Sequence, residues 1–216
     1  MLSTFIIALR EGLEACLIVG ILVAYIVKTN RQGYLKPLWT GVVTAVIASI
    51  ALGAFLTMTS VSLSDRGQEL FAGVTSFIAV ALVTWMVFWM KRTARSLRNE
   101  LQGKVDSAVR GGPLALAGVA FIAVIREGLE TSLFVYTNFQ TVADVTSSTV
   151  GLILGFAVSI TLGYLIYKSA IRLNLAKFFT YSGVALIIVA AGVLSYGVHE
   201  FQELGYLPGP DAFAWD

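Results

Sequence analysis

Six segments of mainly apolar residues, each about 20 residues long, fill most of the 216-residue chain and restrict what it can fold into. They cover residues 2–27, 38–58, 70–90, 113–137, 150–167 and 178–198. A helix needs roughly 20 apolar residues to cross the hydrocarbon core of a bilayer. Only 13% of the residues are charged, against about 25% in soluble domains, and the mean hydropathy is +0.81. We therefore predict an all-α polytopic membrane protein with six transmembrane helices.

The loops between these segments differ in charge. Basic residues are retained on the cytoplasmic side of a membrane, and Arg66 is the only one in the second and fourth loops. The first, third and fifth loops hold the following basic residues: Lys28, Arg31, Lys36; Lys91, Arg92, Arg95, Arg98, Lys104, Arg110; Lys168, Arg172 and Lys177. We predict a multi-pass protein of the cytoplasmic membrane with both termini outside. The 91–110 segment is expected to be a loop that fixes this topology and contacts anionic lipid.

The five letters REGLE occur twice, at residues 10–14 and 126–130, and both copies lie in the middle of an apolar segment. Each copy is in the first helix of a set of three. Because three crossings are an odd number, the second set must enter the membrane in the opposite sense. We predict two inverted three-helix repeats, residues 1–110 and 111–198, followed by an acidic extracytoplasmic tail at 199–216. In inverted-repeat transporters the substrate site lies near the midplane, where equivalent helices meet.

The spacing within REGLE places its charges on one helix face. Residues three or four apart are neighbours on a helix, so Arg10 and Glu11 both lie beside Glu14. The second copy repeats this arrangement. A charge at mid-helix costs about 2.5 to 3.5 kcal/mol, and four carboxylates face two guanidinium groups, so a bound cation is the natural counterion. Carboxylates favour hard ions such as iron, manganese, magnesium or calcium. The candidate metal ligands are Glu11, Glu14, Glu127 and Glu130, with supporting charge from Arg10 and Arg126.

Other interpretations of these charges remain open. A structural ion pair between two helices explains one arginine and one glutamate per helix, and the glutamates also suit a proton relay. A di-iron enzyme commonly needs Glu-x-x-His pairs, but the only histidine is His199, outside the predicted membrane helices, so we do not expect an enzyme. The alternative transporters are proton-coupled carriers or exporters of another divalent cation or of a small organic solute.

The twin REGLE motifs and the ending HEFQELGYLP resemble the oxidase-dependent iron transporter family, which includes fungal high-affinity iron permeases and bacterial permeases of ferrous-iron uptake. The resemblance covers nearly the whole chain. It implies a permease that moves iron, in the ferric form after external oxidation, across the cytoplasmic membrane, with iron as the substrate and no prosthetic group. It also implies an extracytoplasmic iron-binding protein and an oxidase or haem peroxidase as partners. Family members usually have a seventh membrane helix.

Several further residues carry weaker expectations. Glu200 and Glu203, three apart beside His199, are either a site where metal first binds or a solvated helix end. Small residues recur every fourth position along the fifth segment, a pattern typical of close helix packing. Trp89 is expected to anchor its helix at the membrane interface. Cys16 lies about 200° around the helix from Glu14 by the 3.6-residue repeat and is expected to face away from the carboxylates.

Overall fold

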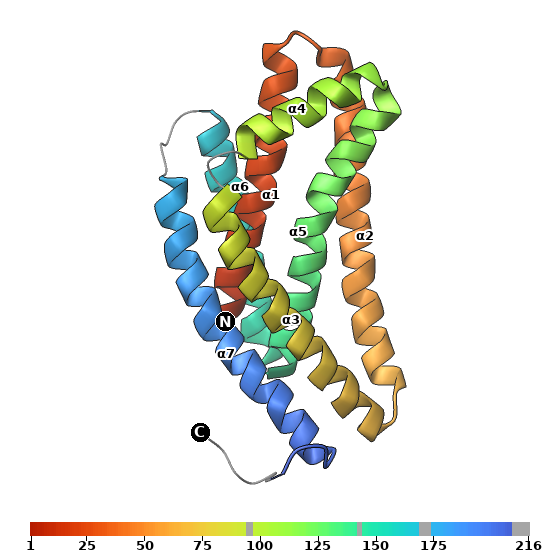
Figure 1. Cartoon of the computed structure of the whole chain (residues 1–216), viewed down its shortest axis with the longest axis vertical. Coiled ribbons are helices and arrows are strands. Elements are labelled where there is room, and N and C mark those ends of the chain that lie inside the picture. The colour runs from red at the N-terminus through yellow and green to blue at the C-terminus, as the bar shows by residue number, and fades with distance from the viewer. Residues whose placement is uncertain (94–96, 142–143, 169–173, 209–216) are drawn as a thin grey trace.

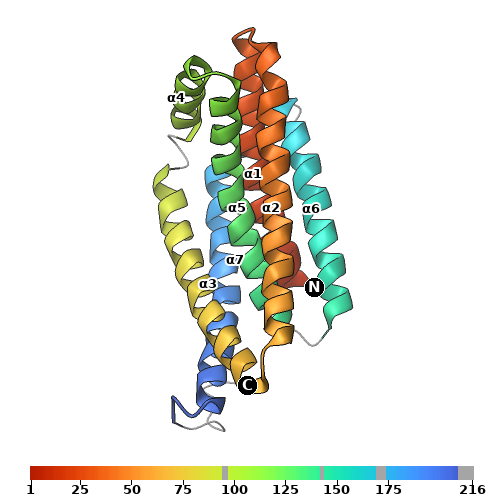
Figure 2. The same cartoon turned by 90° about the vertical axis from the view of Figure 1, so that its right-hand side faces the viewer.

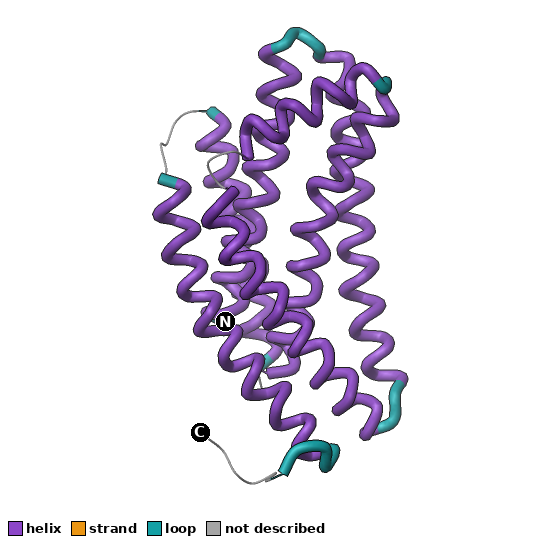
Figure 3. The backbone as a smooth tube through the Cα atoms, in the orientation of Figure 1, coloured by secondary structure: helices purple, strands orange, loops and turns teal. Residues whose placement is uncertain are grey.

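The computed structural model describes residues 1–93, 97–141, 144–168 and 174–208, and these residues form helices and short turns without a strand (Figure 3). The elements, in chain order, are α1 (Leu2–Lys28), the 3-10 helix η1 (Gln32–Tyr34), α2 (Leu35–Ser62), α3 (Asp65–Thr93), α4 (Leu97–Arg110), α5 (Pro113–Thr141), α6 (Val145–Tyr167) and α7 (Leu175–Glu203). The all-α prediction is confirmed.

The six predicted membrane segments correspond to the six long helices. Among the described residues, four helices, α2, α3, α6 and α7, are long and apolar enough to cross a membrane. The helices α1 and α5 have 27 and 29 residues, and they differ from the other four because each contains the three charges of a REGLE motif. The helices run along the long axis of one bundle (Figure 2).

The expectation of a loop over residues 91–110 is wrong for most of that segment. Residues 97–110 form α4, which lies across one end of the bundle (Figure 1). Leu101, Val105 and Ala108 recur at helical spacing and are buried against α1 and α5. Asp106 on the same helix accepts hydrogen bonds from the Tyr25 hydroxyl at 2.6 Å and from Arg31 at 2.9 Å. The spacing of Leu101, Val105 and Ala108 in the sequence is typical of an amphipathic helix. This spacing, considered together with the basic residues, predicts α4.

The long helices pair mainly across the two halves of the chain, with weaker contacts within each half. The helix α1 packs mainly against α6, α2 against α5 and α3 against α7, while α1 also crosses α5. Helices α1, α2 and α3 of the first half are equivalent to α5, α6 and α7 of the second. Under this equivalence the pair α1–α6 becomes α5–α2, while the pairs α3–α7 and α1–α5 remain the same. That is the pattern of an inverted repeat with a two-fold axis between the halves.

The same relation holds residue by residue at the closest helix contacts. A Cβ on Gly12 of the first REGLE would overlap the Ser159 hydroxyl of α6, and a Cβ on Gly128 of the second would overlap Ser49 of α2. Ser159 follows Ser49 by 110 positions, and Gly128 follows Gly12 by 116. Likewise, Gly163 packs on Cys16, while Gly53 faces Ser132. The small residues predicted for packing in the fifth segment, namely Gly151, Gly155, Ser159 and Gly163, are all buried.

Two apolar clusters lie above and below the REGLE motifs. At the α4 end, the larger cluster is formed by α1, α2, α4 and α5 around Leu22, Leu38 and Leu116. Toward the opposite end, a second cluster joins α1, α3, α5 and α7. It consists of Ile7, Ala79, Val83, Met86, Phe134, Leu186 and Ala190, and we call it the apolar seal.

The end of α7 lies beyond the predicted start of the tail. The helix continues to Glu203, so His199, Glu200 and Glu203 belong to it. Of the acidic tail residues, Asp211 and Asp216 lie outside the described residues.

Candidate functional site

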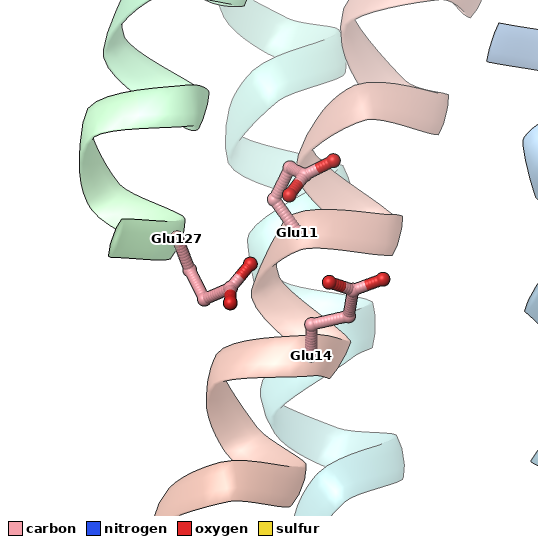
Figure 4. A group of neighbouring side chains, drawn as sticks. All are labelled: Glu11, Glu14 and Glu127. Atoms are coloured by element: carbon pink, nitrogen blue, oxygen red, sulfur yellow. The ribbon is translucent and has the colours of Figure 1, made fainter. Parts of the chain in front are cut away.

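The two REGLE motifs meet where α1 and α5 cross in the middle of the bundle. Because the helices run in opposite directions, the second glutamate of the first motif, Glu14, lies close to the first glutamate of the second motif, Glu127. Carboxylate oxygens of Glu11, Glu14 and Glu127 all lie within 4.8 Å of one another, and the three residues are buried (Figure 4). We call these three residues the carboxylate group. It brings together three of the four predicted metal ligands.

Arg10 is the buried counter-charge of this group. One Nη atom lies 2.6 Å from Glu11 Oε1 and the other lies 2.9 Å from Glu14 Oε1. The Arg10 side chain is 1% exposed and also contacts the sulfur of Met86 on α3. A guanidinium presents a rigid fork of donors, so Arg10 fixes the positions of both carboxylates of the first motif.

Arg126 of the second motif has a different environment, although its sequence context is the same. Its side chain is 37% exposed, and its Nε donates to Glu130 Oε1 at 3.2 Å. Its guanidinium lies over the ring of Trp89, 3.9 Å from the ring centroid, in cation–π geometry. Trp89, expected from the sequence only as an interfacial anchor, therefore contacts a REGLE side chain. Glu130, the fourth predicted ligand, is held by Arg126 outside the group of three.

Buried carboxylate oxygens without a hydrogen-bond partner among the described residues occur on all four glutamates. They are Oε2 of Glu11, Glu127 and Glu130 and both oxygens of Glu14, of which Oε1 forms the ion pair with Arg10, and all are shielded from solvent. Buried polar atoms in proteins are normally hydrogen-bonded. Four carboxylates against two arginines also leave an excess of negative charge. The group is therefore suited to hold a cation through hard oxygen ligands.

A cavity of about 810 Å³ connects the carboxylate group with the α4 end of the bundle. Glu14, Glu127 and Arg126 line its inner part, and the ion pair between Lys104 and Glu100 lines the part nearest α4. Cys16 also lines this cavity. Its side chain packs against Gly163 of α6, so its predicted direction away from the carboxylates is not contradicted, although Glu14 and Cys16 border the same space.

On the opposite side of the carboxylate group, the path is closed. The apolar seal packs Ile7 of α1 and Phe134 of α5 between α3 and α7, and the space among these residues is only about 20 Å³. That volume is about the size of one water molecule. In this conformation the carboxylate group is reached from the α4 end alone, as far as the described residues show.

The predicted residues at the end of α7 form a separate group. The imidazole of His199 lies 3.2 Å from Glu203, and Glu200 is 7% exposed and hydrogen-bonded to Tyr196. Within the part of the chain that the structure describes, these residues do not join the carboxylate group.

The whole sequence, residues 1–216, matches the iron permease FTR1 family. This chain belongs to that family. It is 39% identical to the ferrous iron permease EfeU of Escherichia coli O6:H1 over 208 residues, which are 95% of this chain and 75% of the relative. It is 38% identical to the ferrous iron permease EfeU of Yersinia pestis, covering 95% of this chain and 73% of the relative. No solved structure matches the chain.

Membership of the FTR1 family confirms the coarse functional predictions. The chain is an iron permease, hence a transporter and not an enzyme, with iron as the transported ion. It is also a multi-pass membrane protein, in agreement with its apolar helices.

Three features of this FTR1 permease were missed at the sequence level. These are the serines that fill the space beside the REGLE glycines, the contact between Trp89 and Arg126, and the helix α4. Aligning the second and fifth apolar segments, in addition to the first and fourth, would have paired Ser49 with Ser159. The contact of Trp89 with Arg126 depends on how α3 packs against α5. The sequence pattern does not predict this packing.

Proposed function

We propose that this permease moves iron across the cytoplasmic membrane through a cation site formed by Glu11, Glu14 and Glu127, with Glu130 as a fourth ligand. The observation that supports this proposal is that Glu11, Glu14 and Glu127 are buried and mutually close, and that Glu14 and Glu127 line the inner end of a large cavity. A desolvated group with excess negative charge is costly without a counter-ion. Iron supplies that charge during transport.

Arg10 and Arg126 support this site by partial neutralisation. Their two charges reduce the repulsion among four carboxylates, so that the bundle remains folded when no ion is bound. They also leave Oε2 of Glu11, Glu14 and Glu130 available, since only the Oε1 atoms of these three residues face the guanidinium groups.

We further propose that the ion is ferric iron, produced from ferrous iron by an oxidase or haem peroxidase outside the membrane. An extracytoplasmic iron-binding protein would deliver it. Carboxylate oxygens are hard ligands, and the higher charge of the ferric ion offsets more of the negative excess. Uptake assays with ferric citrate and with ascorbate-reduced iron would compare the two oxidation states.

The end of α7 is the proposed position at which metal first binds. Glu203 and His199 are close enough to share an ion, and Glu200 lies on the same turn of the helix. The alternative, a solvated helix end, predicts no change in iron affinity when Glu200 and Glu203 are both replaced by Gln. A rise in the KM for iron with unchanged maximal rate would support the loading position.

The test of the central site is uptake of radioactive iron by proteoliposomes that contain purified permease. Glu14→Gln and Glu127→Gln keep the side-chain size and remove the charge, so each should abolish uptake while the protein still purifies as a folded species. Asp65→Asn is the matched control, since Asp65 is exposed at the start of α3 and its loss should leave uptake unchanged.

Two results would count against the proposal. Wild-type uptake by a well-folded Glu14→Gln, Glu127→Gln double variant would leave REGLE as a structural ion pair. Equal uptake of manganese by the wild-type protein, with no competition from iron, would favour transport of another divalent cation instead.

A further inference from the structure

The two sides of the carboxylate group are unequal in this conformation, although the chain is built from equivalent halves. Toward the α4 end, Cys16, Ile18 and Gly20 of α1 and Ala123 of α5 line the cavity. Toward the other end, the apolar seal closes the path. The helix contacts follow the two-fold relation between the halves. Access to the carboxylate group does not, because one side is open and the other is closed.

Equivalent positions of the two halves lie on opposite sides of this division. Ile7 and Phe134 in the seal correspond to Ala123 and Ile18, which line the cavity, by the 116-residue offset of the motifs. The same helix positions therefore already exist in two environments within one molecule. One environment faces an open space and the other is packed.

Tyr136 is an independent sign that the closed side also opens. Its side chain is 5% exposed, and its hydroxyl has no hydrogen-bond partner among the described residues. Burying a hydroxyl without a partner destabilises the packed state. The equivalent residue in the first half is Gly20, which lines the cavity and has nothing within 4 Å of where its Cβ would lie. Opening of the closed side would give the Tyr136 hydroxyl access to water.

We propose that the carboxylate group has a second route, on the side opposite α4, which opens when the two halves exchange conformations. Ser132 and Tyr136 of α5 line it, as the counterparts of Cys16 and Gly20 of α1. In the exchanged conformation the cavity beside α4 closes, so that iron reaches the carboxylates from one side at a time. This inference rests on the proposed function, because it requires the carboxylate group to be the transport site.

Exchange is a natural property of inverted repeats. Each half can adopt the conformation of the other, so two states of similar free energy exist, and ligand or sequence differences set their populations. The structure holds one of these states, with Arg10 buried and Arg126 bordering the cavity.

Cysteine accessibility tests the proposal, because Cys16 is the only cysteine in the chain. The variant C16S/S132C moves the thiol to the equivalent position of the other half with conservative changes. Charged methanethiosulfonate reagents should modify Cys16 from the α4 side and the Ser132→Cys thiol from the opposite side. A Thr44→Cys control in the Cys16→Ser background places the thiol on the exposed surface of α2, where lipid should protect it from both sides.

A second variant biases the equilibrium between the two states. Gly20→Phe places a bulky ring in the cavity, so the cavity walls should no longer be able to close. The second state should then be populated less, and modification of Ser132→Cys should slow by about tenfold or more. Iron uptake should fall by a similar factor. Gly192→Phe on α7 is the matched control, because Gly192 also has open space around it but does not line the cavity, and it should change neither measurement.

The outcomes separate this inference from the proposed function. If C16S/S132C transports iron but its thiol is never modified from the side opposite α4, the exchange is overturned while the carboxylate site stands. Unchanged modification of Ser132→Cys in a folded Gly20→Phe variant also overturns it. If Gly20→Phe does not fold, modification of C16S/S132C alone decides. Full uptake by Glu14→Gln, in contrast, overturns the proposed function whatever the labelling shows.

Discussion

Ser49 of α2 occupies the space that a Cβ on Gly128 of the second REGLE motif would need. Its hydroxyl remains hydrogen-bonded to its own helix, at 2.8 Å from the Ala45 carbonyl. The glycine of the motif is therefore required for the approach of α2, while the flanking charges serve the ion. The same holds for Gly12 and Ser159 in the other half.

Replacement of the motif glycines should destabilise the bundle. Gly12→Ala or Gly128→Ala forces a methyl group into a serine side chain, and overpacking of this kind costs typically 1 to 3 kcal/mol. The thermal unfolding temperature in detergent should fall for both variants. Gly20→Ala is the control, since the space beside Gly20 is open. Equal unfolding temperatures for Gly12→Ala and Gly20→Ala would contradict the close contact.

The two arginines should respond unequally to substitution, because their surroundings differ. Arg10→Gln leaves two buried carboxylates without their partner, and breaking a buried ion pair costs about 3 to 5 kcal/mol. The yield of folded protein should therefore collapse. Arg126→Gln should fold better, since its side chain is partly exposed. Lysine should not restore full uptake at position 10, because it cannot present a planar fork to two carboxylates. Gel filtration and iron uptake measure both effects.

The predicted orientation can be tested with single cysteines in a Cys16→Ser background. A cysteine at Ser64, between α2 and α3, should react with an impermeant maleimide in intact cells, because the basic loops should lie inside. A cysteine at Ser107 on α4 should react only after the membrane is permeabilised. The reverse labelling pattern would place both termini in the cytoplasm and move the cavity to the outer face.

The attachment of α4 should depend on Asp106. The hydrogen bond from Tyr25, together with Arg31, lowers the pKa of Asp106 below its ordinary value. The ionised carboxylate therefore favours the docked helix above the ordinary pKa of about 3.9, and this contribution is lost as the pH falls through the lowered value. Asp106→Asn should remove this contribution to the docking of α4 at neutral pH. Faster trypsin cleavage at Arg110 than in the wild type would report the loosened helix.

Glu100→Gln is the control for that experiment. Glu100 pairs with Lys104 on the same helix at 2.7 Å, and both side chains are about half exposed, so its loss should leave the attachment of α4 unchanged. Exposed pairs of this type contribute little to stability. Equal cleavage of Asp106→Asn and wild type would show that the apolar contacts of Leu101 and Val105 hold α4 alone.

Much of the fold could be predicted from the sequence, for identifiable physical reasons. Membrane helices are fixed by length and hydropathy, and the duplicated REGLE marked α1 and α5 as equivalent. The proximity of Glu14 and Glu127 followed from their mid-helix positions and opposite directions. The burial of Arg10 and the partial exposure of Arg126 could not be predicted, because identical letters carry no information about which half is closed. The cavity depends on how α4 covers the bundle, which is a tertiary property.

The pairing of helices across the halves has a consequence for biogenesis. The main partner of α1 is α6, and α1 has few contacts with α2. During synthesis, α1 enters the membrane with three charged side chains, and its packing partner is complete only after Tyr167 has left the ribosome. We therefore expect the insertion machinery or a membrane chaperone to shelter α1 from lipid until then. Truncation before α6 should therefore yield a nascent chain that is recognised by quality-control proteases, even though its first four hydrophobic segments are intact.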